Sequence, residues 1–70
     1  MTTVFPNMGK VKTMIYKKGW SWAELARRSG LSLNTLFALQ SKRRKASERT
    51  MYKLATALNV EPADIVEKEN

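Results

Sequence analysis

The chain has 70 residues and a formal net charge of +7, from 13 Lys or Arg against 6 Asp or Glu, and it contains neither Cys nor His. This length fits one small domain, which buries only about 60% of the surface of its unfolded chain. Without Cys or His there are no disulfides, thiolate metal sites or imidazole bases. The chain is also too small for a large pocket, so we expect no enzyme, no metal, no cofactor and no small-molecule substrate.

The first six residues are apolar but short, and Pro6 disfavours helix at Phe5. We therefore expect residues 1–6 to form an extended or loosely packed arm, and residues 7–70 to form the domain. No apolar run approaches the roughly 20 residues that a membrane span requires, and no signal peptide is evident. These features predict a cytoplasmic protein without a membrane partner.

Three helices are predicted in the first part of the domain. Asn7 is a good N-cap for a helix over residues 7–19, which ends at Gly19. Ser21 and Glu24 match a capping box, in which each side chain reaches the other residue's amide, at the start of a helix over 21–30. Gly30 ends that helix, and Ser32 caps the next one, over 32–41. Two short helices joined by a tight turn result.

The remainder of the chain predicts two more helices. Met51, Leu54, Ala55 and Leu58 form a buried stripe in a helix over residues 47–59. A short fifth helix follows over residues 62–66, with Pro62 at its first position. No strand pattern appears. The predicted fold class is all-α, with five short helices around one core.

The positive charge is concentrated in the first three-quarters of the chain. Residues 1–53 hold 12 Lys or Arg, and 4 consecutive cations follow the second of the paired helices, Lys42-Arg43-Arg44-Lys45. Such a field attracts a polyanion. Nucleic acid is the first candidate, an anionic membrane surface is the second, and a merely solvated basic surface is the third. The cations lie in a loop rather than along one amphipathic face, which disfavours the membrane.

These patterns resemble the lambda-repressor-like helix-turn-helix family, which includes the phage repressor and Cro proteins and many small bacterial regulators. The resemblance extends over roughly residues 8–66, and the matching residues are Gly19, Ser21, Glu24, Leu25, Ala26, Gly30, Leu31, Ser32, Thr35, Leu36, Leu39, Ser47, Leu54, Ala55, Leu58, Val60 and Ile65. It implies a compact five-helix domain that binds operator DNA, usually as a homodimer, with the helix over 32–41 in the major groove. Many members have Gly at the position of Lys42.

The resemblance implies that the base-reading positions are Leu33, Asn34, Thr35, Phe37 and Ala38. It places Trp22, Ser41, Arg43 and Lys45 at or near phosphates. Cation placement by itself adds Lys42, Arg44, Arg49 and, more weakly, Lys10 as phosphate contacts. Arg27 and Arg28 are expected to be ordinary solvated charges.

Base reading rests on few side chains. Asn34 suits bidentate bonding to adenine, and Leu33 and Phe37 can touch thymine methyl groups. This favours A/T-rich half-sites, or weak specificity helped by DNA shape. Phe37 could instead pack against the arm at Phe5 or against a partner protein.

The protein is predicted to be a transcriptional regulator that binds double-stranded DNA sequence-specifically, a repressor encoded by a mobile element or a bacterial chromosome. The alternative is a protein-interaction module on the same fold, of antitoxin or anti-repressor type, that uses Leu33 and Phe37.

Overall fold

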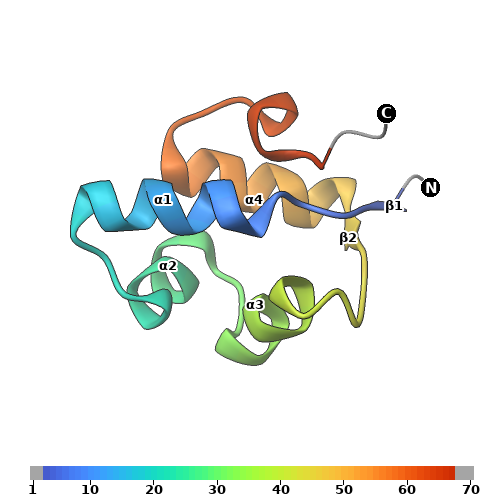
Figure 1. Cartoon of the computed structure of the whole chain (residues 1–70), viewed down its shortest axis with the longest axis horizontal. Helices are drawn as coiled ribbons and strands as arrows, with labels where there is room; N and C mark the ends of the chain where they lie inside the picture. The colour runs from blue at the N-terminus through green and yellow to red at the C-terminus, as the bar shows by residue number, and fades with distance from the viewer. Residues whose placement is uncertain (1–2, 68–70) are drawn as a thin grey trace.

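The computed structural model describes residues 3–67, so the predicted ends of the arm (1–2) and of the domain (68–70) lie outside the described residues. Four α-helices, one 3-10 helix and two short strands follow in chain order: β1 (Thr3–Val4), α1 (Met8–Lys18), α2 (Trp22–Ser29), α3 (Leu33–Gln40), β2 (Ala46–Ser47), α4 (Glu48–Leu58) and η1 (Pro62–Ile65). Figure 1 shows α2 and α3 on one side of α1 and α4, and η1 on the other.

The helix ends follow the sequence signals. The side chains of Asn7, Ser21, Ser32 and Ser47 each accept a hydrogen bond from the amide three residues later. Such a cap stabilises a helix by about 1 kcal/mol. Gly19, Gly30 and Asn59 end their helices in the left-handed conformation. The prediction of a complete capping box at Ser21 is wrong in one of its two hydrogen bonds. The Glu24 carboxylate accepts from Arg27 and Arg28 rather than from the Ser21 amide.

Two glycines give substitutions with opposite expected signs. Gly30 has a φ of +74°, and a Cβ there meets no atom within 4 Å, so Gly30→Ala costs only backbone strain, about 1–2 kcal/mol. Gly9 lies in the first turn of α1, where a Cβ makes ordinary contact with Asn7 Oδ1 at 3.6 Å. We expect Gly9→Ala to stabilise the fold by roughly 0.5 kcal/mol. Urea unfolding of both variants checks this, and destabilisation by both would contradict it.

The prediction of a fifth α-helix is wrong. Residues Pro62–Ile65 form one turn of 3-10 helix, and Val66 is already extended, with a ψ of 141°. The tertiary reason is that Val66 pairs with Pro6 in an antiparallel bridge, while the Glu67 amide donates to the Phe5 carbonyl at 2.8 Å. The chain therefore leaves the helical conformation in order to pair with the arm.

The expectation that strands are absent is also wrong, although the arm is extended as expected. Val4 pairs with Ala46 and Thr3 with Ser47, in a two-stranded antiparallel sheet. Strands of two residues are too short to show the alternation that reveals a strand in a sequence. The arm therefore lies between β2 and the chain segment after η1, and Pro6 is buried there.

One apolar core joins these elements. Its largest fully buried side chains come from all four α-helices and η1: Val11, Ile15, Leu25, Leu36, Leu39, Leu54 and Ile65. Among the buried side-chain polar atoms of the described residues, none lacks a hydrogen-bond partner. Leu25 of α2 and Leu36 and Leu39 of α3 are buried in this one core, so core packing, together with the turn at Gly30, fixes α3 relative to α2. Within residues 3–67, no helix combines the length and apolar character required to cross a membrane.

Candidate nucleic-acid interface

The helix α3 has a buried face and a solvent face. Leu36 and Leu39 are at most 1% exposed, whereas Leu33 and Phe37 are 37% and 42% exposed. Asn34 is exposed too, and Thr35 and Ala38 are half-buried at the boundary. Leu33 and Phe37 are four positions apart and therefore neighbours on one side of α3, so they form an apolar patch that makes this face a candidate contact surface.

A groove runs beside this face of α3. It has a volume of about 460 Å³ and is lined by Asn34, Thr35, Phe37, Ala38, Arg43 and Arg44. The structure therefore brings four of the five predicted base-reading residues together with two predicted phosphate contacts. Leu33 lies on the same helix, one residue before Asn34, and is not part of the lining.

Two hydroxyl groups near this groove are already engaged within the protein. The Thr35 hydroxyl lies 2.8 Å from the Ser32 hydroxyl, so it braces the start of α3. At the other end, the Ser41 hydroxyl donates to the Ala38 carbonyl and accepts from Arg43 Nε at 2.9 Å. Ser41 thus holds the Arg43 guanidinium at the end of α3, and the remaining guanidinium N–H groups stay available to an anion.

The other cations of the run turn toward the chain ends. Lys42 Nζ donates to the Glu67 carboxylate at 3.0 Å and lies 5.7 Å from the centre of the Phe5 ring. Lys45 Nζ lies 5.4 Å from the same ring. Lys42 has a φ of 60°, in the left-handed region that favours glycine. This agrees with the Gly at the same position in many members of the family that the sequence resembles. Within residues 3–67, neither Arg43 nor Arg44 has an acidic partner.

The remaining predicted phosphate contacts lie away from this groove. Trp22 is half-buried at the start of α2 and packs against the core. Lys10 is an exposed residue of the first turn of α1. Arg49 lines a different groove, between α4 and η1, together with Met51 and Tyr52.

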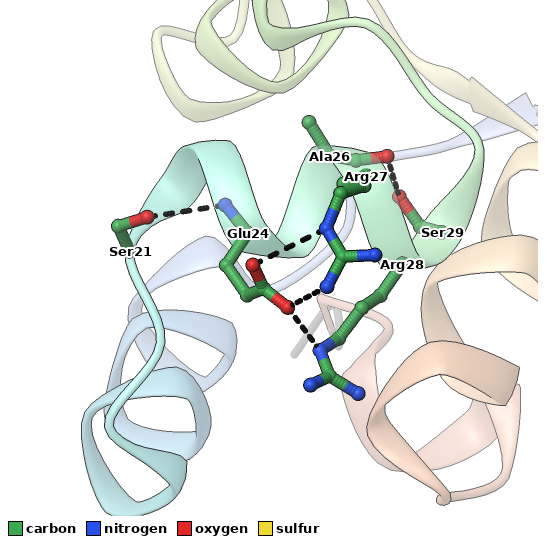
Figure 2. A network of polar contacts seen from close by, with 6 residues as sticks. All are labelled: Ser21, Glu24, Ala26, Arg27, Arg28 and Ser29. Carbon is green, nitrogen blue, oxygen red and sulfur yellow. Dashed lines mark hydrogen bonds and ion pairs between the residues drawn. The ribbon is translucent and has the colours of Figure 1, made fainter.

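The two arginines of α2, Arg27 and Arg28, form ion pairs with Glu24 of the same helix. Figure 2 shows the Glu24 carboxylate between the guanidinium groups of Arg27 and Arg28, and Arg27 Nε lies 3.3 Å from Glu24 Oε1. The hydrogen bonds from Arg27 and then Arg28 hold the pKa of Glu24 below its ordinary value of 4.5. Glu24 therefore stays ionised at neutral pH, and the two arginines are exposed but paired.

The sequence interpretation missed Phe5 and Glu67 as neighbours of the basic run. Lys42 and Glu67 are 25 positions apart, and no local spacing rule predicts such a contact. The one available signal was the excess of acids after residue 60, opposite in sign to the loop.

Comparison with known proteins agrees with the helix-turn-helix arrangement of α2 and α3. A family model described as helix-turn-helix (HTH_3) matches residues 12–65 of the chain. A crystal structure described as a hypothetical transcription factor NHTF from Neisseria is similar to this fold, with a TM-score of 0.72 and 33% sequence identity. That similarity covers 77% of this chain and 61% of the solved chain, so this chain spans less than two thirds of the length of that structural neighbour. No curated protein matches the chain.

Proposed function

The chain belongs to the helix-turn-helix family HTH_3, of Cro/C1 type, and we propose that it is a sequence-specific repressor that reads the major groove of double-stranded DNA with α3. The observation that carries this proposal is the groove in which Asn34, Thr35, Phe37 and Ala38 lie beside two arginines without acidic partners among residues 3–67. The similar Neisseria protein is described as a hypothetical transcription factor, which supports the same function here. A cytoplasmic location is part of this proposal.

The proposed division of labour follows from the chemistry of the two sets of side chains. Arg43 and Arg44 neutralise phosphates and release counterions, which gives affinity for any sequence. Asn34 accepts from and donates to adenine, and the exposed Leu33 and Phe37 contact thymine methyl groups. Thr35 and Ala38 line the groove at the helix surface, where small side chains let the backbone approach the bases.

A salt titration tests the proposal directly. Binding to a random duplex is measured by gel shift over a range of salt concentrations. If four or five phosphates are contacted, log K falls against log salt with a slope of roughly −4. Failure to bind any duplex at low salt would leave Leu33 and Phe37 to the alternative role, contact with a partner protein.

Asn34→Ala tests the base-reading assignment. We expect a binding-site selection with this variant to lose discrimination at one base position, by about 1–3 kcal/mol, with little change at the others. An unaltered preference would remove Asn34 from the base-reading set.

Homodimerisation on DNA is the second part of the proposal. An apolar groove of about 550 Å³ lies between α4 and η1, lined by Val4, Glu48, Arg49, Met51, Tyr52, Pro62, Ala63 and Val66. In Figure 1, η1 and α3 lie on opposite sides of α4, so a second copy seated on this groove leaves α3 accessible. Glu48 and Arg49 are adjacent and opposite in charge, so a two-fold contact can pair each with the other in the second copy.

Tyr52→Glu tests this interface. Tyr52 is exposed on the lining of the groove, so a charge there opposes association without disturbing the core. We expect sedimentation equilibrium to show a dimer for the wild type and at least a tenfold weaker dimer for the variant, as for one unpaired charge in an interface. Tyr16→Glu, on an exposed residue of α1, is the control and should still dimerise.

A further inference from the structure

The four cations of the run 42–45 face two directions. The Nζ atoms of Lys42 and Lys45 lie 5.7 and 5.4 Å from the centre of the Phe5 ring, on the arm. Arg43 and Arg44 instead line the groove beside α3. The run therefore has two outer residues that contact the arm and two inner residues that adjoin the candidate interface.

The backbone explains this division. The amide of Lys42 donates to the Leu39 carbonyl and that of Arg43 to the Ala38 carbonyl, which is the hydrogen-bond pattern of a left-handed helix end. Lys42 takes the left-handed position, and the chain reverses there, next to the end of α3. At the other end, Lys45 precedes Ala46, which pairs with Val4. Both lysines are therefore anchored beside residues 4–6.

Phe5 occupies the position where these contacts meet. Its carbonyl accepts from the Glu67 amide at 2.8 Å, and its two neighbours, Val4 and Pro6, pair with Ala46 and Val66. Its backbone is thus fixed on both sides, and its half-buried ring is held under the two ammonium groups. A third contact of the cluster is the ion pair between the Glu67 carboxylate and Lys42, at 3.0 Å. Each contact is weak by itself, but all of them converge on the ends of one loop.

Resting on the proposed function, we propose that this basic run is divided by role. Lys42 and Lys45 contact the arm, with Phe5 as the positioning residue of the loop, and within the run only Arg43 and Arg44 contact phosphate. The four cations look equivalent in the sequence. In the structure, the lysines lie at the Phe5 ring and the arginines line the groove beside α3. The arm thereby sets the direction in which the arginines meet DNA.

Four charge-matched variants test the division: Lys42→Gln, Arg43→Gln, Arg44→Gln and Lys45→Gln. Each removes one positive charge from the same loop, so any difference among them comes from direct contact and not from the overall field. For each bound protomer, we expect each arginine variant to flatten the salt slope on random duplex by roughly 0.9, and each lysine variant by less than roughly 0.3. Equal slopes for all four variants, or larger changes for the lysines, would overturn the division.

The role of Phe5 is tested on the free protein by NMR. A ring beneath the lysine side chains shifts their methylene resonances upfield. We expect Phe5→Leu to abolish these shifts and to speed amide exchange at residues 42–46, and Phe5→Tyr, which keeps an aromatic face, to restore both. Unshifted lysine resonances in the wild type would overturn the proposed contact of Lys42 and Lys45 with the Phe5 ring. The same holds for a Phe5→Leu variant with the lysine shifts and amide exchange rates of the wild type. If the wild type bound no duplex, the assignment of Arg43 and Arg44 to phosphates would fail together with the proposed function. The NMR result would still show whether Lys42 and Lys45 contact the Phe5 ring.

Discussion

Leu36→Ala is expected to destabilise the domain by about 2–5 kcal/mol, because Leu36 is fully buried where α3 packs on the core. The truncation removes buried methyl groups and leaves a cavity that the surrounding helices fill only in part. A domain of this size has a total stability of roughly 4–10 kcal/mol, so the loss is a large fraction of the whole. The expected fall in Tm is roughly 10–30 °C, measured by circular dichroism.

Leu33→Ala is the matched control for this experiment. Leu33 lies on the same helix and undergoes the same chemical truncation, but it is on the solvent face, 37% exposed. We expect its Tm to change by a few degrees at most, in line with a surface substitution of about 0.5 kcal/mol. Similar losses in the two variants would mean that α3 is not seated on the core as described. Because Leu33 lies on the exposed face of α3, we expect Leu33→Ala to alter the binding of DNA, or of a partner protein, in the folded domain.

The double variant Arg43→Ala/Arg44→Ala is expected to weaken binding to every duplex by roughly 60-fold per bound protomer at about 0.1 M salt. This figure follows from two lost phosphate contacts, each of which contributes a salt slope of about −0.9. Because phosphates carry no sequence information, the base preferences of the residual binding should be unchanged. Fluorescence anisotropy over a salt series measures both the affinity and the slope.

Arg27→Ala/Arg28→Ala is the control for net charge. It also removes two positive charges, but these arginines lie on α2 and are held by Glu24. We expect only a few-fold loss of affinity, from the weaker overall field. If the two double variants were equally impaired, the affinity would come from long-range attraction and not from contacts in the groove beside α3.

Much of this fold could be predicted because its signals are local. Asn7, Ser21, Ser32 and Ser47 cap their helices through a hydrogen bond to the residue three positions later, and that spacing is visible in the sequence. The buried stripe of α4 is equally local. Leu33, Asn34 and Phe37 are exposed on α3, because the burial of Leu36 and Leu39 fixes the rotation of the helix.

Most of the errors concern contacts between segments that are far apart in the sequence. The fifth helix is a single 3-10 turn because Val66 pairs with Pro6, and the arm is a strand because Val4 pairs with Ala46. Likewise, composition could not tell Lys42 from Arg43, since the partner of Lys42 is Glu67. Register between distant segments depends on the assembled core, which no single stretch of sequence encodes.

The way in which the arm is held has a consequence for biosynthesis. The amide of Asn7 donates to the Ile65 carbonyl at 2.7 Å, and the Phe5 carbonyl accepts from Glu67, so a segment made early is fastened by one made much later. A ribosome must extrude the chain as far as Glu67 before these bonds can close. The basic loop therefore acquires its final orientation only after that later segment has emerged.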